Sequence, residues 1–311
     1  MVVSPSYIAL HRQGILMERV QAAQELLREC TVCPRLCRVN RFESREGWCQ
    51  TNALPVVSAY HPHFGEEAIL VGRHGSGTIF LTSCSLRCVF CQNWEISHLR
   101  LGEEVSHQRL AEMMVELQTQ GCHNINFVTP THMVPQILAA LPAAIDMGLS
   151  IPLVYNTGGY DRVETLRLLD GVVDIYMPDV KYMDSAHAKR YSGAEDYPQT
   201  VCAAVKEMHR QVGDLVISEK GLAERGLLVR HLVMPNGVSD TSQVMRFLAQ
   251  EVSPHTYVNL MDQYHPYGDA YRYPEIARPL TPEEFEAALE ATRKAGIRRL
   301  DRDIGRRFRR R

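Results

Sequence analysis

The segment Thr82-Ser-Cys-Ser-Leu-Arg-Cys-Val-Phe-Cys-Gln-Asn-Trp94 carries three cysteines, Cys84, Cys88 and Cys91, at C-x3-C-x2-C spacing. It follows directly on a β-branched and apolar run at residues 78–83, which predicts a buried strand. In α/β folds, ligands bind beyond the carboxyl ends of the strands. Three thiols at that position therefore predict a metal or cluster site just after the first strand of the core.

The rest of the chain alternates between short apolar runs and helical patterns. We predict strands at residues 78–83, 124–130, 152–157, 173–180, 226–235 and 257–264. Helices are predicted at residues 14–29, 106–120, 134–147, 162–169, 198–212, 240–251 and 282–295. The last helix has a capping box at Thr281 and Glu284 and a stop at Gly296. Repeated strand–helix alternation predicts a parallel sheet, either doubly wound or curled into a full or partial barrel.

The composition of the 311 residues excludes some classes of protein. Lys and Arg number 34 and Asp and Glu number 36, so no global field marks a nucleic-acid or membrane partner. No run of about 18 apolar residues and no signal segment is present, which argues against membrane insertion and secretion. Seven of the nine cysteines fall between Cys30 and Cys91. Clustered thiols in a reducing compartment bind metal more often than they form disulfides, so we expect a cytoplasmic protein.

Three thiolates can hold three corners of an iron–sulfur cluster. Ferredoxin sites supply four cysteines, and a missing fourth leaves one iron open to a chelating ligand, such as the amino and carboxylate groups of S-adenosylmethionine. Phe90, just before the third cysteine, is placed to pack against an adenine ring. The alternatives are a zinc knuckle and a chance cluster of buried thiols.

This spacing, with an aromatic residue before the third cysteine, resembles the signature of the radical S-adenosylmethionine (radical SAM) superfamily. Further segments resemble its pyruvate formate-lyase activating enzyme branch, especially an uncharacterised activase-like group. They lie at residues 63–67, 75–79, 123–126, 129–132, 155–160, 177–181 and 230–235. The resemblance implies an α/β fold with a partial (β/α)6 barrel at residues 76–270. A cysteine-rich N-terminal extension (1–75) and a C-terminal helix with a basic tail (271–311) would flank it.

The resemblance also implies a chemistry, in which a reduced [4Fe–4S] cluster splits S-adenosylmethionine to methionine and a 5′-deoxyadenosyl radical that abstracts hydrogen. The implied cofactor-binding residues are Phe90, Asn93, Thr131, Asn156, Thr157, Asp179, Lys181 and Arg230. Asn156, Thr157 and Asp179, with Met177, match positions that bind a monovalent cation near the cofactor. For all of these, the alternative is a solvated or salt-bridged polar group at a strand end.

Lys181 is the candidate for the carboxylate of S-adenosylmethionine, since a compact ammonium suits an anionic group, and Arg230 is a second candidate. Two segments depart from the activase pattern. Residues 129–132 replace the Gly-Gly-Glu that would hold the methionine amino group, so backbone carbonyls or Thr131 are the candidates there. Residues 262–265 stand where the activases carry a histidine. The substrate therefore stays open.

A second set of cysteines, Cys30, Cys33, Cys37 and Cys49, has C-x2-C-P-x2-C-x11-C spacing. Four thiolates can close a zinc site or a fully ligated iron–sulfur cluster, and spacing alone does not fix the metal. Either would saturate the metal, so its role would be structural or electron-relaying. A reduced set without metal is the alternative.

The leading hypothesis is a radical enzyme that abstracts hydrogen, with a glycyl radical protein or peptide as the target and flavodoxin or ferredoxin as electron donor. A second hypothesis is direct modification of a small molecule or peptide. A hypothesis of another class is a zinc or iron–sulfur protein without catalysis. The missing fourth ligand near Cys91 distinguishes an enzyme from an electron carrier, because an electron carrier supplies a thiolate to every iron of its cluster.

Overall fold

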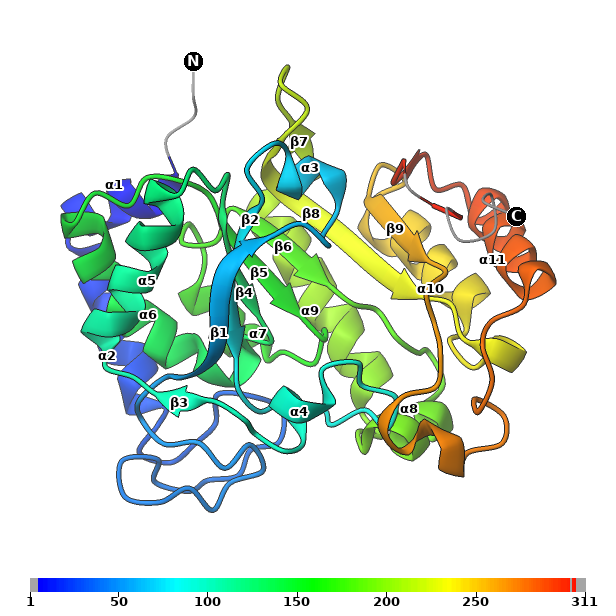
Figure 1. Ribbon diagram of the computed structural model, residues 1–311, viewed down its shortest axis with the longest axis horizontal. Helices are drawn as coiled ribbons and strands as arrows, with labels where there is room; N and C mark the ends of the chain where they lie inside the picture. Colours follow the sequence, from blue (N-terminus) through cyan, green and yellow to red (C-terminus); the bar gives the residue numbers. More distant parts are fainter. Residues whose placement is uncertain (1–4, 303, 306–311) are drawn as a thin grey trace.

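The computed structural model describes residues 5–302 and 304–305. Its centre is a sheet in which six strands run parallel and pair in chain order (Figure 1). These strands are β2 (Ser76–Leu81), β4 (Ile125–Val128), β5 (Leu153–Thr157), β6 (Ile175–Pro178), β8 (Ala223–Leu232) and β9 (Tyr257–Met261). Each predicted strand position therefore holds a strand. Because the strand order does not reverse, the sheet is not doubly wound, and the partial barrel stays a prediction.

Four further strands escaped the sequence reading: β1 (Val56–His63), β3 (Glu103–Glu104), β7 (Val216–Ile217) and β10 (Arg299–Leu300). β1 lies within the expected N-terminal extension, yet it pairs antiparallel with β2 from Val57 to His63. β10 lies within the expected C-terminal segment and pairs with β9. The sheet thus extends into both flanking segments. The tail at residues 303 and 306–311 lies outside the described residues.

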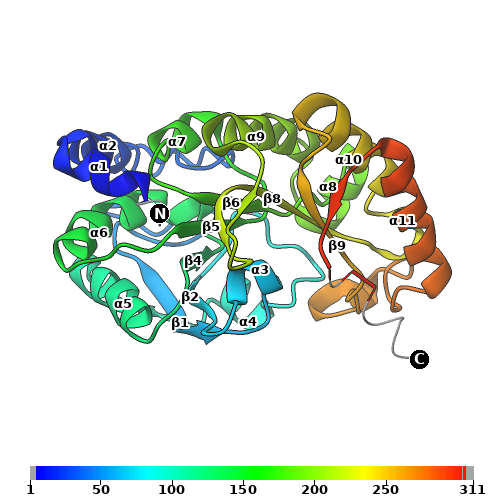
Figure 2. The ribbon, with the colours of Figure 1, turned by 90° about the horizontal axis from the view of Figure 1, so that it is seen from above.

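Helices cover the outside of this sheet, as Figure 2 shows from above. They are α1 (Ser6–Arg12), α2 (Ile15–Glu25), α5 (His107–Thr119), α6 (Val134–Asp146), α7 (Val163–Leu168), α8 (Ser185–Ser192), α9 (Tyr197–Val212), α10 (Thr241–Phe247) and α11 (Pro282–Ala295). The short helices α3 (Ala68–Val71) and α4 (Trp94–Ser97) stand on the other side. Gly14, with φ of 78°, separates α1 from α2. The helix predicted at residues 14–29 corresponds to α2, which ends at Glu25, and α1 was not predicted.

Alternation along the strands divides the core between the two faces of the sheet. In β6, Tyr176 belongs to the large apolar cluster beneath the outer helices, whereas Ile175 and Met177 belong to a smaller cluster that includes Leu70 of α3. α11 begins with the predicted capping box, in which Glu284 N–H donates to Thr281 Oγ1 at 3.3 Å, and it ends at Gly296. Both faces of the sheet are buried, and its carboxyl edge is left to the loops.

Candidate active site

Three cysteines occupy the loop from β2 to α4, at the carboxyl end of the sheet. Cys88 is buried, and Cys84 and Cys91 are half-buried. Each sulfur atom accepts at least one hydrogen bond, from Leu86 N–H to Cys84 Sγ (3.3 Å), from Ser192 Oγ to Cys88 Sγ (3.0 Å) and from Ser97 Oγ to Cys91 Sγ (3.2 Å). Donors aimed at sulfur stabilise thiolates and tune the potential of a cluster that they hold. The structure therefore confirms the predicted position of the three thiols after the first parallel strand.

Burial raises the pKa of the Cys88 thiol to about 12, and the neighbouring Cys84 and Cys91 add to the shift. The ammonium of Lys181 opposes it. Lys181 also lowers the pKa of Cys91, which burial raises. The ammonium of Lys181 therefore lies near both thiols. An ammonium at this place suits the thiolates of a cluster and an anionic ligand beside it.

Lys181 belongs to a network of charges at the ends of β6 and β8. Its Nζ donates to Asp179 Oδ2 at 2.7 Å, and Arg230 Nε donates to Asp179 Oδ1 at 2.8 Å. Arg230 also donates to Asn156 Oδ1 at 2.7 Å and to Glu66 Oε2 at 3.1 Å. The structure thus brings three polar residues, Asp179, Asn156 and Glu66, around the guanidinium of Arg230, and each of its three nitrogen atoms donates to one of them.

The charges in this network fix one another. Burial alone would raise the pKa of Asp179, but Arg230 and Lys181 outweigh it and hold that pKa at about 2. Burial disfavours the ammonium of Lys181, yet Asp179 and Cys88 raise its pKa above the usual value. The carboxylate and both cations therefore stay charged at neutral pH.

Thr131 and Thr157 are both buried. Their hydroxyl oxygens are 2.9 Å apart, and Thr157 donates to Asp161 Oδ2 at 2.6 Å. Tyr155 donates to the other carboxylate oxygen of Asp161 at 2.8 Å. Burial raises the pKa of Asp161, and these hydroxyl donors oppose the shift. Asp161 was not predicted as a site residue, although it directly follows the segment Tyr155–Tyr160.

Phe90 and Asn93 lie on either side of Cys91. Phe90 is buried and packs edge-on against Tyr182 and Tyr264, with ring centroids 6.4 and 6.0 Å apart. Asn93 is exposed at the start of α4, and its backbone N–H bonds to Cys91, which lowers the pKa of that thiol. The aromatic ring thus forms a wall beside the cysteines, and the asparagine faces outward.

Two segments that depart from the activase pattern differ in burial. His132 is buried; its Nε2 bonds to the Thr82 carbonyl at 2.8 Å, and burial lowers its pKa to about 4. The neutral ring therefore braces the end of β2. His265 is exposed after β9, and its Nδ1 lies 3.2 Å from the Gln263 carbonyl.

Glutamates from the loop after β1 enter the inner face of the sheet. Besides its bond to Arg230, Glu66 accepts from Asn126 at 3.2 Å. Glu67 is buried, which raises its pKa, and it accepts from Asn259 at 2.7 Å. In the sequence, these glutamates stand out only as part of the segment at residues 63–67 that resembles the activase branch. The apolar run that follows them at residues 68–71 is a signal of burial.

The second set of cysteines lies in the loop between α2 and β1. Cys30, Cys33 and Cys49 are buried and Cys37 is half-buried. Among the residues that the structure describes, no three or more Cys, His, Asp or Glu side chains gather in a group that could hold a single metal ion. A cluster distributes its thiolates over several irons.

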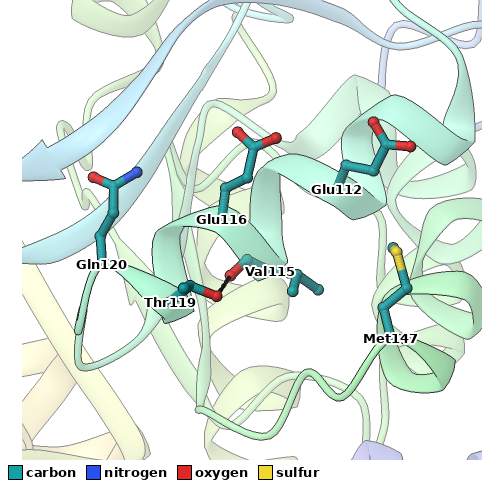
Figure 3. Close-up of a pocket in the computed structure, with 6 residues that line it drawn as sticks. All are labelled: Glu112, Val115, Glu116, Thr119, Gln120 and Met147. Carbon is teal, nitrogen blue, oxygen red and sulfur yellow. Dashed lines mark hydrogen bonds between the residues drawn. The ribbon is translucent and has the colours of Figure 1, made fainter.

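A surface pocket of about 330 Å³ lies elsewhere, on α5 (Figure 3). Its lining includes Glu112, Glu116 and Met147 and none of the predicted site residues. The only bond between the residues drawn joins Thr119 Oγ1 to the Val115 carbonyl at 2.8 Å, within the helix. This pocket is a feature of the outer helical layer.

Comparisons with known proteins agree with the cysteine motif. The profile of the radical SAM superfamily matches residues 78–219. An uncharacterized protein of Methanocaldococcus jannaschii is 32% identical over 295 residues, which cover 92% of this chain and 80% of that protein. A second from the same organism is 25% identical over 290 residues, or 86% of this chain and 77% of that protein.

Among solved structures, a radical SAM methyltransferase from Sphaerobacter thermophilus matches with a TM-score of 0.48 and 13% identity, over 72% of this chain and 65% of that one. In the part of the chain that is described, no helix is long and apolar enough to cross a membrane.

Proposed function

We propose that this chain, which belongs to the radical SAM superfamily, cleaves S-adenosylmethionine reductively in order to start a hydrogen abstraction. Superfamily membership implies a [4Fe–4S] cluster and S-adenosylmethionine as cofactors and supports an enzyme. When bound, the cluster supplies the electron that breaks the sulfonium bond. The protein supplies placement and a dry site.

One observation carries this proposal: three thiols that each have a hydrogen-bond donor face a cation instead of a fourth thiol. Lys181 acts electrostatically on both Cys88 and Cys91. An electron carrier would present a fourth cysteine to the last iron. Here the fourth position is left to a ligand, and Lys181 is placed to hold its carboxylate. Phe90 and Tyr264 exclude water from the cysteine side, since both are buried.

Arg230 acts as a brace rather than a second ligand group in this proposal. At two of the positions that the resemblance offers to a monovalent cation, the side-chain oxygens Asn156 Oδ1 and Asp179 Oδ1 accept hydrogen bonds from Arg230. Its guanidinium therefore supplies the positive charge at that place. Equal product yield with potassium or tetramethylammonium as the monovalent cation would support this role, and a strict need for potassium would contradict it.

The target and the setting of the reaction are finer parts of the proposal. By resemblance to the activase branch, the hydrogen donor is a glycyl radical protein or peptide, the electron donor is flavodoxin or ferredoxin, and the compartment is the cytoplasm. Support comes from the segments at residues 155–160 and 177–181, which supply Asn156, Asp179 and Lys181 to the network.

The test is a reaction of the full chain under anaerobic conditions. The protein is reconstituted with iron and sulfide and mixed with S-adenosylmethionine and dithionite, and 5′-deoxyadenosine is measured. Product is expected from the native chain and is expected to fall in Lys181→Ala, with Lys189→Ala as the matched surface control. An intact cluster that yields no 5′-deoxyadenosine would overturn the proposal.

A further inference from the structure

The two cysteine loops are joined directly to one another inside the protein. Ser83, which precedes Cys84, donates from Oγ to the Cys49 carbonyl at 2.5 Å, and both residues are buried. Arg87 donates to the Trp48 carbonyl, next to Cys49. In Figure 1 the loop after α2 lies at the lower edge of the molecule, beside the loop that precedes α4. The loop that carries the second cysteine set is therefore attached to the loop that carries the first.

Arg87 lies between the two sets of thiols. It directly precedes Cys88, and its guanidinium lies 4.8 Å from the centre of the Trp48 ring, next to Cys49. Ser83 and Arg87 have φ of 75° and 61°, a left-handed conformation that non-glycine residues adopt at a cost. The contacts to Cys49 and Trp48 hold these two residues in it. The path of the loop that carries Cys84 and Cys88 is thus set partly by the N-terminal loop.

Two of the four N-terminal cysteines have polar groups close to their sulfur atoms. Trp48 N–H donates to Cys37 Sγ at 3.2 Å, and Cys49 Sγ lies 3.1 Å from Thr51 Oγ1. The sulfur atoms of the three active-site cysteines also have hydrogen-bond donors. Both loops are therefore prepared for thiolates.

The N-terminal loop is also the outer of the two. A surface pocket of about 390 Å³ beside Cys37 is lined by Arg35, Trp48 and Arg87. The guanidinium of Arg35 stacks on Trp48 at 3.9 Å and donates to the Ser85 carbonyl at 2.8 Å. Solvent thus reaches Cys37 through this pocket, and a redox partner can approach it there.

We propose that Cys30, Cys33, Cys37 and Cys49 hold a second iron–sulfur cluster, which relays an electron across the Cys49–Ser83 contact to the cluster at Cys84, Cys88 and Cys91. Each transfer moves one electron from a low-potential one-electron donor, and no covalent bond forms or breaks. Four thiolates saturate this cluster, so it binds no S-adenosylmethionine. The destination of the electron rests on the proposed function; the second cluster itself does not.

The first experiment counts metal in the full chain after anaerobic reconstitution. About eight irons per chain are expected, and about four in the triple variant Cys84→Ala, Cys88→Ala, Cys91→Ala, as two [4Fe–4S] clusters require. Cys37→Ala is expected to lose the other four and keep 5′-deoxyadenosine formation with dithionite. One zinc per chain in place of the second set of irons, or no metal in the triple variant, would overturn the inference.

The second experiment tests the contact between the loops. With both clusters reduced, the electron paramagnetic resonance spectrum of the native chain is expected to show spin–spin broadening, which Cys37→Ala removes. Stopped-flow reduction of the inner cluster by reduced ferredoxin is expected to be severalfold slower in Ser83→Ala. Ser85→Ala, which keeps the carbonyl that Arg35 contacts, is the matched control. Non-interacting spectra, or unchanged reduction in Ser83→Ala, would exclude the relay.

The two proposals fail in different ways. If only the relay is wrong, dithionite-reduced protein still yields 5′-deoxyadenosine. If only the cleavage is wrong, that product is absent while the triple variant still retains its irons.

Discussion

Two aspartates flank strand β6 and show how differently the two ends of the sheet use a buried carboxyl group. At the amino end, burial raises the pKa of Asp174 to about 7, opposed by a hydrogen bond from Leu153 N–H at 2.9 Å. At the carboxyl end, burial acts on Asp179 too, but Arg230 and Lys181 outweigh it and hold the pKa at about 2. The same residue type on one strand is thus half-neutral at one end and permanently charged at the other.

The difference lies in what each end is built to do. Direct ion pairs at the carboxyl end keep a fixed charge pattern beside the cysteines, and such patterns mark sites where a charged ligand is oriented. The amino end buries its aspartate to satisfy a backbone amide. The functional residues therefore lie at the end of the sheet where opposite charges compensate the burial of the carboxylate.

The largest expected effect distinguishes a thiol at the carboxyl end of the sheet, Cys88, from one at the amino end, Cys122. Cys88→Ala is expected to abolish 5′-deoxyadenosine formation and to remove the inner cluster, because one iron loses its thiolate. Cys122→Ala, which changes a buried thiol just before β4 at the amino end, is expected to keep both. Iron analysis and chromatography of the product measure the outcome. Product from Cys88→Ala would refute the placement of the cluster.

The second effect concerns stability at pH 8. Asp179→Asn leaves Arg230 and Lys181 without their shared carboxylate, which is expected to lower the free energy of unfolding by about 3 kcal/mol. Asp174→Asn removes no ion pair in direct contact and relieves a buried negative charge, so no such loss is expected. Urea denaturation of the two variants and the native chain checks this. Equal losses would mean that the two ends do not differ.

The third effect is a pH dependence. The pKa of Asp174 is raised in the folded protein, so its contribution to stability is complete below about pH 4 and is lost as the pH rises through about 7. Between pH 5 and pH 7 the native chain is expected to lose about 2 kcal/mol relative to Asp174→Asn. Asp179 has the opposite sign: its contribution is present above about pH 4 and is lost toward pH 2. Parallel urea-stability curves for the native chain and Asp174→Asn would contradict the assignment.

The smallest effect is on the reduction potential of the inner cluster. Ser192→Ala and Ser97→Ala each remove a hydroxyl that donates to a cysteine sulfur. Less stabilisation of the added electron is expected to make the midpoint potential more negative. Potentiometric titration followed by electron paramagnetic resonance measures it, with Ser218→Ala, next to β7, as control. A positive shift would show that these hydroxyls do not act on the cluster.

Much of the fold was predictable because it depends on local periodicity. The parallel strands, the capping box of α11 and the three cysteines after β2 each depend on a short stretch of local sequence. β1 was missed because it mixes serine, histidine and proline with its apolar residues, and only Val57 of the strand is buried. The two-residue strands were missed because they depend on their partners rather than on a pattern of their own.

The site was predictable only in part. Lys181 and Asp179 stand two positions apart in a recognisable segment, but Glu66 and Arg41 gain their roles from distant partners. Glu66 meets Arg230 across 164 positions of sequence, and buried Arg41 reaches the His132 carbonyl across 91. No local spacing reports such contacts. They follow from the order in which the strands are laid side by side.

That order also has a consequence for synthesis. All seven clustered cysteines precede β4, so they leave the ribosome before five of the six parallel strands. The residues that hold the N-terminal cysteine loop in place are synthesised much later, since Arg35 bonds to the carbonyls of Ser192 and Gly193 at the end of α8. A nascent chain therefore carries seven thiols that its scaffold does not yet cover. This interval is when iron and sulfide can be delivered and when oxygen can trap the thiols as disulfides, so yield of intact protein should depend on oxygen during expression more than after folding.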